Sequence, residues 1–381
     1  MKKINFDAKC ILTQLSHVAA VVGQKNSMPI LDCIKLETFY DESQNVVLKM
    51  TASDAETWIS EKAFVNGDIG INVCVGADDF LKGLRNLSDT NVELEIDDES
   101  HTITCNYANG FFKLTIDNAD DFPTCKNDID ESATYQLEAS KLFANISSVL
   151  FATTDDALRP ALNCVHVDLL ANGGMVFVAT DGQKLAKIKD SSLNCGNVED
   201  MAFNLPNKPT NLLLNILNSQ DENVSFKFND CAIVFFNDIF TIETRLQETR
   251  YPNYNSVIPN EFVAKATFNR QELIDAIKRV APMGNTTSEL MKLDFSIGKI
   301  IATAENIDFC KKGQETINCE YNGENMGIGF KSSFLLQSAQ NINCERIDMH
   351  IINNTRAVVL SPNESSSNCE YTYLLMPLLL D

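Results

Sequence analysis

Two acidic residues are candidates for chemistry because each follows an apolar run that is typical of a buried strand. Residues 175–179 form such a run, and Thr180-Asp181-Gly182 follows it; Asp54 follows a similar run nearer the N-terminus. An exposed carboxylate can act as a general base, and two of them suggest an Asp-dependent hydrolase. An Asp-Gly pair is also a common turn signal, so Asp181 has a structural explanation as well.

The other residues that could do chemistry are scattered along the chain. No nucleophile, base and orienting group stand together around Asp181. The twelve cysteines include no Cys-x-x-Cys pair, and the histidines show no metal-ligand spacing with them or with one another; these are His17, His101, His166 and His350. We therefore expect no catalytic residue, no metal and no cofactor, and we expect the cysteines to be reduced and mostly buried in a cytoplasmic protein.

Composition narrows the class of protein. The 381 residues are 44% apolar and 22% charged, which is typical of a folded chain of two or three domains. No apolar run approaches the roughly 20 residues of a membrane-spanning helix, and the N-terminus lacks the apolar stretch of a secretory signal. The net charge of −21 argues against a protein that binds nucleic acid tightly on an open face.

The chain contains three copies of one pattern. Asn306 follows a third strand-like run, and the step from Asp181 to Asn306 is almost the same as the step from Asp54 to Asp181. Amphipathic-helix patterns recur with equal spacing at Ile11, Leu142 and Leu273. The predicted buried faces of these three helices are Ala8, Ile11, Leu12, Leu15, Ala19 and Val22; then Leu142, Phe143, Ile146 and Leu150; then Leu273, Ile274, Ile277 and Ala281.

The rest of each copy repeats in the same order. A second helix is predicted at 77–87, 207–217 and 331–342, and an alternating closing strand at 111–116, 240–245 and 371–376. Phe122-Pro123 and Tyr251-Pro252 then lie about one repeat apart. We predict an α+β fold of three repeated domains, each with two helices packed on antiparallel sheets, at 1–124, 125–251 and 252–381. The turn after the strand-like run recurs in all three copies, which is expected of a residue that forms the turn and not of a single catalytic residue. We therefore interpret Asp181 as structural rather than catalytic.

Domain size suggests how such repeats could be used. A domain of this length is roughly 35 Å across, so three in contact enclose a hole of only about 5 Å, whereas six enclose one of about 35 Å. Duplex DNA is roughly 20 Å wide. Two chains that pair head to tail supply six domains, and a two-fold dimer is the commonest closed oligomer. The geometry thus permits a ring around a duplex.

Four motifs together resemble the bacterial DNA polymerase III beta subunit, the replicative sliding clamp. They are "SMPILDCI" (27–34), "VATDGQKLA" (178–186), "YPNYNSVIP" (251–259) and "YLLMPLLL" (373–380), and the resemblance covers the whole chain. It implies a homodimeric head-to-tail ring around double-stranded DNA, with helices inside and sheets outside, and no enzymatic activity. It also implies partners: the replicative polymerase catalytic subunit, the clamp loader and other proteins with a clamp-binding peptide. Enclosure without tight phosphate contacts is compatible with the acidic charge.

Basic residues on the polar faces of the predicted helices are candidates to face the DNA: Lys9, Lys82, Arg85, Lys141, Lys208, Lys278 and Lys331. The resemblance adds Lys25 and Arg159. Several residues depart from the family pattern, namely Pro160 and Ala161 where aromatics are frequent, and Asp78, Asp79 and Asp156 where basic or neutral groups are usual. We expect a weak electrostatic contribution to DNA binding.

The resemblance also implies an apolar groove between the second and third domains that accepts a partner peptide. Its wall would consist of Leu162, Thr180, Gly182, Lys184, Leu185, Pro252, Val257, Leu374, Met376, Pro377 and Leu378. Gly182 allows close approach of a backbone, and Met376 adapts to varied ligands. Gln183, Lys184, Ser256 and Leu379 stand where family members carry histidine or basic residues, so we expect a less basic rim.

The implied dimer contact joins Phe112 and Leu114 of one protomer to Pro282 and Met283 of its partner. Alternation places Phe112 and Leu114 on one face of an edge strand. Two alternatives remain open at this point: a clamp paralogue that binds partners without encircling DNA, and an Asp-dependent hydrolase.

Overall fold

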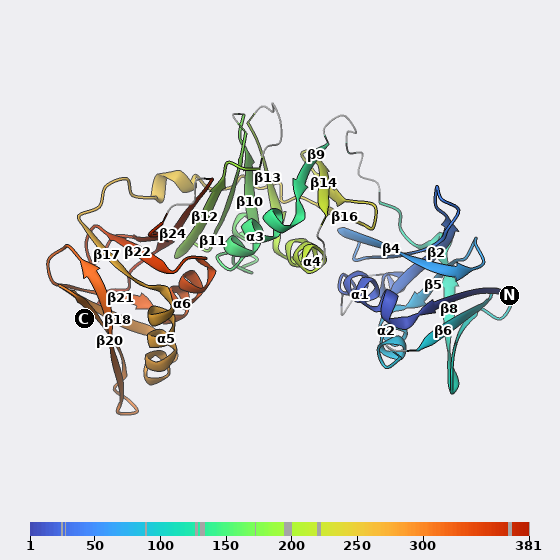
Figure 1. Cartoon of the computed structure of the whole chain (residues 1–381), viewed down its shortest axis with the longest axis horizontal. Helices are drawn as coiled ribbons and strands as arrows, with labels where there is room; N and C mark the ends of the chain where they lie inside the picture. The colour runs from blue at the N-terminus through green and yellow to red at the C-terminus, as the bar shows by residue number, and fades with distance from the viewer. Residues whose placement is uncertain are drawn as a thin grey trace. The chain divides into compact units, whose positions relative to one another are not determined.

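The computed structural model describes residues 1–23, 26, 28–87, 90–125, 129, 134–171, 173–193, 200–218, 222–364 and 368–380. The chain divides into two compact units (Figure 1). The first comprises Met1–Ser140 and Lys208–Leu246, and the second comprises Lys141–Asn207 and Gln247–Asp381. Each unit holds one twelve-stranded sheet, and every strand pairing among the described residues is antiparallel.

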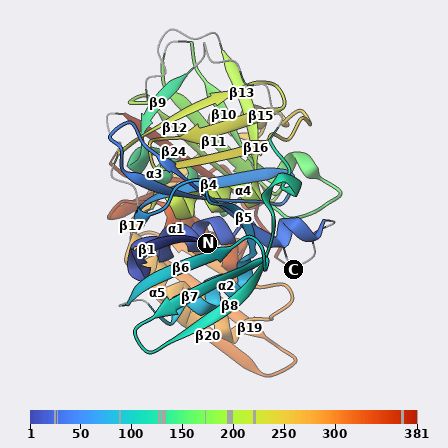
Figure 2. The ribbon, with the colours of Figure 1, turned by 90° about the vertical axis from the view of Figure 1, so that its right-hand side faces the viewer.

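The sheet of the first unit has the order β1-β6-β7-β8-β5-β2-β3-β4-β16-β15-β14-β9, and β1 also pairs with β4. That extra pairing closes the first eight strands into a ring around an apolar core, and Figure 2 shows β6, β7 and β8 side by side in it. The strands are β1 (Lys2–Asp7), β2 (Cys33–Tyr40), β3 (Val46–Ser53), β4 (Thr57–Gly67), β5 (Asn72–Gly76), β6 (Asn91–Asp97), β7 (Thr102–Tyr107), β8 (Gly110–Asn118), β9 (Tyr135–Glu138), β14 (Asn223–Phe228), β15 (Ala232–Phe236) and β16 (Phe240–Arg245).

Three helices belong to the first unit: α1 (Ala8–Ala19), α2 (Ala77–Arg85) and α4 (Asn207–Leu217), with short 3-10 turns at η1 (Pro29–Asp32) and η2 (Ala119–Asp121). The Asp7 carboxylate caps α1 by accepting the Lys9 N–H, and α1 packs against α2. Ile11, Leu15 and Val18 form the buried stripe of α1. Val18 replaces the predicted Ala19 and Val22 because the helix ends at Ala19, one turn earlier than the pattern suggested.

The sheet of the second unit has the order β13-β10-β11-β12-β24-β23-β22-β17-β20-β19-β18-β21. Its strands are β10 (Cys164–Leu169), β11 (Met175–Thr180), β12 (Lys184–Asp190), β13 (Met201–Pro206), β17 (Ala264–Asn269), β18 (Leu290–Ser296), β19 (Lys299–Asn306), β20 (Lys311–Tyr321), β21 (Met326–Lys331), β22 (Arg346–Ile351), β23 (Val358–Pro362) and β24 (Cys369–Leu375).

The helices of the second unit are α3 (Ala139–Leu150), which begins at the unit boundary, α5 (Arg270–Val280) and α6 (Ser332–Asn341), with 3-10 turns η3 (Pro160–Leu162), η4 (Tyr254–Val257) and η5 (Ala281–Met283). The α5 and α6 helices pack together. Val149 and Val280 are buried where the sequence pattern placed Leu150 and Ala281, which are only half-buried. In α3 and α5 only the last member of the predicted stripe is shifted by one residue toward the N-terminus, and Leu142, Ile146, Leu273, Ile274 and Ile277 are buried as predicted.

The predicted fold class is confirmed: the chain is α+β, with three repeats that contain the helix pairs α1/α2, α3/α4 and α5/α6. In each repeat we call the turn at Asp54, Asp181 or Asn306 the corner. The strand that follows the corner of one repeat pairs with the last strand of the next repeat. Thus β4 pairs with β16, with Thr57 opposite Thr244, and β12 pairs with β24, with Lys184 opposite Leu375. The domain bounds 1–124, 125–251 and 252–381 stay a prediction.

β8 and β20 each have a long stretch of unpaired edge among the described residues, in addition to the strands β9, β13 and β21 that end the two sheets. Within the described residues, positions 110–115 of β8 pair with β7 alone, and positions 311–318 of β20 pair with β19 alone. β8 closes the first repeat and β20 follows the corner of the third repeat. They are therefore the two strands that would make the third junction of the series.

The cysteines are less buried than predicted. Of the eleven that the structure describes, Cys33, Cys74, Cys105, Cys164 and Cys319 are buried, and the other six are half-buried or exposed. Burial raises the pKa of Cys33 to about 11 and the pKa values of Cys74, Cys105 and Cys164 to about 12. Those thiols are protonated at neutral pH. In the described part of the chain, no helix is long and apolar enough to cross a membrane.

Candidate functional site

The corner at Asp181 is a hairpin turn held by the Asp181 side chain. Asp181 Oδ1 accepts the backbone N–H groups of Gln183 and Lys184, both at 2.8 Å, and Gly182 adopts a φ of +90°. In the first repeat Asp54 Oδ1 accepts the N–H groups of Glu56 at 3.1 Å and Thr57 at 2.8 Å. This is the turn that Asp and Asn form readily with the backbone two and three residues on.

The remaining carboxylate oxygen of each aspartate is also bonded. Asp181 Oδ2 accepts Lys184 Nζ at 2.7 Å, and Asp54 Oδ2 is bonded to Lys208 Nζ. The two aspartates lie in different sheets. Each carboxylate is therefore used by its own turn and its own lysine, which supports the structural interpretation of Asp181.

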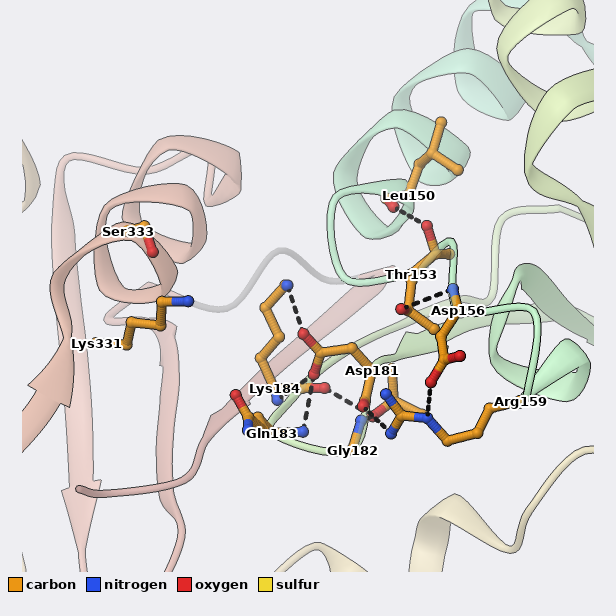
Figure 3. A network of polar contacts seen from close by, with 12 residues as sticks. Leu150, Thr153, Asp156, Arg159, Asp181, Gly182, Gln183, Lys184, Lys331 and Ser333 are labelled. Atoms are coloured by element: carbon orange, nitrogen blue, oxygen red, sulfur yellow. Dashed lines mark hydrogen bonds and ion pairs between the residues drawn. The ribbon is translucent and has the colours of Figure 1, made fainter. Parts of the chain in front are cut away.

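Lys184 lies inside the protein rather than on a rim. Its side chain is 7% exposed, and its Nζ lies 2.7 Å from Asp181 and 4.2 Å from the centre of the Phe334 ring. Lys331 Nζ lies 4.7 Å from the centre of the same ring. Figure 3 shows Lys184 directed at Asp181, with Lys331 on the neighbouring segment. The sequence placed Lys184 in the groove wall, but its charge is taken up by the Asp181 pair and the aromatic face.

Arg159 joins the loop before η3 to the Asp181 turn. Its Nε donates to Asp156 Oδ2 at 2.9 Å, and its Nη1 donates to the Asp181 carbonyl oxygen at 2.8 Å (Figure 3). A Cβ at Gly182 would lie 3.3 Å from Nη1, so the guanidinium sits beside that glycine. Hydrogen bonds from the Leu158 N–H and from Arg159 hold the pKa of Asp156 below its ordinary value. The Arg159 side chain is half exposed and is positioned by the protein.

An apolar cluster lies beside this turn on the β10–β11–β12–β24 part of the sheet. Leu185 of β12 stands opposite Leu374 of β24, and both belong to a buried cluster with Tyr251 against which Tyr254 and Ile258 pack. The other buried members of the cluster are Cys164, Val176, Val178 and Ala357. We call this region the Leu185–Leu374 patch, including Val257 and Met376 at its surface.

The predicted groove residues separate into two layers. Thr180, Leu185 and Leu374 are buried, with 3–9% of their surface exposed. Val257 is 56% exposed and Met376 is 45% exposed, while Leu162, Pro377 and Leu378 are half-buried and Gly182 and Pro252 are exposed. An exposed apolar surface is the form that interaction sites take.

The C-terminal tail is anchored on both sides of Pro377. The Met376 N–H donates to the Gln183 carbonyl oxygen at 2.9 Å, and the Leu378 N–H donates to the Gly329 carbonyl oxygen at 2.8 Å. These bonds fix the backbone while the Met376 and Leu379 side chains stay exposed. The apolar tail is thus held in place with its side chains available.

Sequence reasoning missed part of the patch. Tyr251, Tyr254 and Ile258 belong to the quoted Tyr-Pro motif but were not assigned to the groove wall, although Pro252 and Val257 were. Their signal was available, since large apolar residues flank both of those positions. Cys164, Val176 and Val178 could not be assigned to this cluster from the sequence, because small apolar residues of predicted strands occur in every hydrophobic core.

The predicted DNA-facing residues have varied surroundings. Lys9, Lys82, Arg85, Lys208 and Lys278 are exposed on α1, α2, α4 and α5, whereas Lys141 is half-buried on α3. Lys82 is paired with Asp78 at 2.5 Å, and Lys208 with Asp54. Lys331 precedes α6 as its N-cap, so it does not lie on the polar face of that helix as predicted. Lys25 lies outside the described residues.

The predicted dimer residues lie on β8 and η5. Phe112 covers Gly83 of α2, where a Cβ would lie 2.6 Å from the Phe112 ring, and Leu114 is half-buried on the same face of β8. Met283 is 36% exposed, and a Cβ at Gly313 of β20 would lie 2.9 Å from its Cγ. Pro282 is exposed. Among the described residues, no group of three or more His, Cys, Asp and Glu could hold a metal ion.

The regions that match known proteins extend over nearly the whole chain. Residues 3–126, 136–253 and 255–378 match the DNA polymerase III beta subunit N-terminal, central and C-terminal domains. The chain is 26% identical to the beta sliding clamp of Synechococcus elongatus over 381 residues, covering 97% of this chain and 96% of that one. It is 24% identical to the beta sliding clamp of Streptococcus pneumoniae over 387 residues, covering 99% of each.

Solved structures show the same fold. A sliding clamp from Pseudomonas aeruginosa bound to griselimycin matches with a TM-score of 0.89 and 23% identity, covering 100% of each chain. The DNA polymerase III beta subunit of Thermotoga maritima matches with a TM-score of 0.88 and 22% identity, again covering 100% of each. With three successive beta-subunit domains matched along its length, this chain belongs to the DNA polymerase III beta subunit family, the bacterial sliding clamps.

Proposed function

We propose that two copies of this chain close head to tail into a ring that encloses duplex DNA and tethers the replicative polymerase to it. The observation that carries the ring is the series of strand junctions. β4 pairs with β16 and β12 pairs with β24, so each repeat is joined to the next one by the same kind of strand pair. The open edges of β8 and β20 are the remaining members of the series.

The two existing junctions predict the register of the third. Thr244 pairs with Thr57 and lies four residues after Phe240, which closes the β15–β16 hairpin. Gly110 closes the β7–β8 hairpin, and the residue four positions later is Leu114. Leu114 is therefore the counterpart of Thr244.

The corner of the third repeat supplies the other strand. Lys311 faces Asn306 across that corner as Thr57 faces Asp54 across the first one. Lys311 is therefore the counterpart of Thr57. Leu114 of one protomer would then lie opposite Lys311 of its partner.

This register brings the predicted dimer residues together. Phe112 would face Gly313 of the partner, beside the Met283 that packs against that glycine. Since Met283 already covers Gly313, Phe112 would lie against the Met283 side chain. Phe112, Leu114, Pro282 and Met283 therefore stay our proposed dimer contact.

Enclosure explains how an acidic chain can work on DNA. The net charge is −21, and some of the candidate cations are already paired, Lys82 with Asp78 and Lys208 with Asp54. Adhesion of this chain through phosphate contacts would be weak, because few cations are available to replace counterions. We assign Lys9, Lys82, Arg85, Lys141, Lys208, Lys278 and Lys331, with Lys25 and Arg159, to the DNA-facing side. A clamp of this kind works on the chromosome in the cytoplasm.

Retention on DNA of different topology tests the ring. The protein is loaded onto a nicked circular plasmid with the clamp loader and ATP, and the complex is isolated by gel filtration before and after one restriction cut. We expect retention on the circle and loss after the cut, since only a ring is released at an end. A chain that is never retained on the circle would support the alternative of a partner-binding paralogue.

We further propose that the Leu185–Leu374 patch is the partner-peptide groove, for the polymerase, the clamp loader and other proteins with a clamp-binding peptide. An apolar surface with an adaptable methionine suits a set of related peptides. Griselimycin, bound by the solved Pseudomonas aeruginosa relative, is a convenient probe.

Substitution of the exposed layer tests this groove. Met376→Asp together with Val257→Asp should weaken griselimycin binding by at least about tenfold, because two carboxylates would be desolvated on binding. Ile297→Asp is the matched control, since Ile297 is 84% exposed on the β18–β19 turn of the same unit. Isothermal titration calorimetry measures both. Equal affinity of the double variant and the wild type would place the binding site elsewhere.

A further inference from the structure

A polar cluster lies directly beside the apolar patch, and the proposed groove does not account for it. His166 and Asp168 lie on β10, and Tyr251 and Tyr254 belong to the segment 247–258 that follows β16. The His166 ring stacks on the Tyr251 ring at 4.5 Å with an interplanar angle of 9°. The His166 side chain is 13% exposed. The inference below rests on the proposed groove.

Both ring nitrogens of His166 face hydrogen-bond acceptors. Nδ1 lies 2.7 Å from Asn204 Oδ1, and Nε2 lies 3.1 Å from Asp168 Oδ1. The orientation of the Asn204 amide is fixed, because its Nδ2 donates to the backbone carbonyl oxygens of Gln247 at 3.1 Å and Thr249 at 2.9 Å. Asn204 Oδ1 must therefore accept from His166.

Only the doubly protonated ring satisfies both acceptors. A neutral imidazole has one N–H, so either Asn204 Oδ1 or the Asp168 carboxylate would face a nitrogen lone pair. We propose that His166 is a proton-dependent positioning residue, which as an imidazolium holds the segment 247–258 in place and so keeps the partner-peptide groove in its binding form.

The surrounding groups favour the charged ring. Burial raises the pKa of Asp168, but hydrogen bonds from His166 and from the Tyr254 hydroxyl, the latter at 2.6 Å, outweigh burial, and the pKa lies below its ordinary value. Asp168 is thus ionised beside the ring. The π face of Tyr251 adds a favourable contact to a cation.

The other titratable groups around His166 come from β12, which supplies Lys187, and from the segment 247–258, which supplies Tyr251 and Tyr254. Lys187 of β12 donates to Asn255 Oδ1 at 3.0 Å, and its Nζ lies 5.3 Å from the centre of the Tyr254 ring. Burial lowers the pKa of Lys187 and raises the pKa values of Tyr251 and Tyr254. β11 places Val178 opposite His166, and β13 places the neutral Asn204 there. Histidine is the residue type in this set that can carry either one or two ring protons under physiological conditions.

The cluster reaches the groove through the segment it holds. Asn204 is bonded to Gln247 and Thr249, the His166 ring covers Tyr251, and Asp168 accepts from Tyr254. Tyr251, Tyr254 and Ile258 pack on the Leu185–Leu374 patch, and Val257 is its exposed member. Loss of the His166 proton removes one bond from this set. The contribution is present when the ring carries both protons and is lost when it carries only one.

Griselimycin binding across pH tests the proposal on the full-length protein. We expect wild-type affinity to fall about fivefold between pH 5.5 and pH 8.0, at the low end of couplings between sites. His166→Phe keeps the stack on Tyr251 but has no N–H and no proton to lose, so its affinity should not change with pH and should be no higher than the wild-type value at pH 8.0. His350→Phe is the matched control, since His350 contacts Ser361 and Phe262 and should leave the wild-type profile unchanged.

A second measurement separates this inference from the proposed groove. Hydrogen exchange of the peptide 247–258, corrected for intrinsic rates, should show protection that falls with pH in the wild type and not in His166→Phe. Griselimycin binding that keeps its pH profile in His166→Phe overturns the role of His166 and leaves the groove intact. A wild type that binds no griselimycin, but whose segment still responds to pH through His166, supports the positioning role and overturns the groove. If His166→Phe does not fold, His166→Gln, whose amide NH2 donates hydrogen bonds but does not titrate, takes its place with the same expected flat profile.

Discussion

At the Asp181 corner, one carboxylate holds a turn and neutralises a buried lysine. Its Oδ1 accepts two backbone N–H groups, and its Oδ2 accepts Lys184 Nζ at 2.7 Å. Lys184 is 7% exposed, whereas Lys208, the partner of the equivalent Asp54, is 48% exposed. The two aspartates have the same turn but differ in the burial of the charge that each one faces.

This difference gives a prediction for stability. Asp181→Ala should lower the free energy of unfolding by about 3 kcal/mol, because it leaves Lys184 buried without its partner. Asp54→Ala, the matched control, should cost about 1 kcal/mol, since Lys208 can be solvated and mainly the turn bonds are lost. Calorimetric melting of both variants measures the difference. Equal losses would mean that the Lys184 pair contributes no more than an exposed one.

At the scale of elements, the repeated junction shows why one apolar patch arises where the chain has two equivalent positions. Leu185 and Leu374 face each other across β12 and β24, and the corresponding pair across β4 and β16 is Trp58 and Glu243. The Trp58 indole N–H donates to the Pro123 carbonyl oxygen at 3.2 Å, and Cys125 Sγ lies 2.8 Å from a Glu243 carboxylate oxygen. The same backbone thus carries an apolar surface at one junction and a polar one at the other.

The open edge of β8 gives a prediction for the dimer. Tyr107 and Gly110 close a two-residue hairpin, so alternation directs the N–H groups of Phe112 and Leu114 toward β7 and that of Lys113 toward the open edge. Lys113→Pro removes an edge N–H without a loss to β7, and it should weaken the dimer by at least about tenfold. Lys113→Ala removes the charge but keeps the backbone N–H, so it should change the dimer affinity little. Sedimentation velocity over a dilution series measures both, and a Lys113→Pro dimer of wild-type strength would rule out β8 as the paired edge.

At the scale of the whole molecule, the net charge and the proposed function are reconciled by topology. A chain of charge −21 with paired cations has little phosphate affinity to lose. A protein held by phosphate contacts loses affinity steeply as salt rises, because each contact releases counterions. A closed ring is retained for as long as its strand junctions hold.

Salt therefore distinguishes enclosure from adhesion. We expect the fraction of protein retained on a nicked circular plasmid to change less than about twofold between 50 mM and 500 mM NaCl, whereas an adhesive protein would lose several decades of affinity. Protein on the linearised plasmid is the control and should be lost at every salt concentration. Steep loss from the circle at 200 mM would argue for adhesion.

The sequence by itself determined the repeat, the fold class and the family. The repeat and the fold class follow from local pattern: helix periodicity at Ile11, Leu142 and Leu273, strand alternation, and turn formers at Asp54 and Asp181 all depend on neighbours within a few residues. The family follows from the resemblance of four short motifs to those of known clamps. The exposed members of the candidate groove, Val257 and Met376, were predictable for the same reason, since they stand in distinctive short motifs.

Tertiary structure decided where charges and contacts lie. Lys184 could be assigned to a rim from its position in the motif, but its burial depends on Phe334, which comes from α6 in a different repeat. The His166 cluster could not be predicted, because Asn204 of β13 and Tyr254 of η4 join His166 and Asp168 of β10 only in the folded chain. The polarity of a site is set by distant partners brought together in the fold, and a pattern of neighbouring residues carries no record of them.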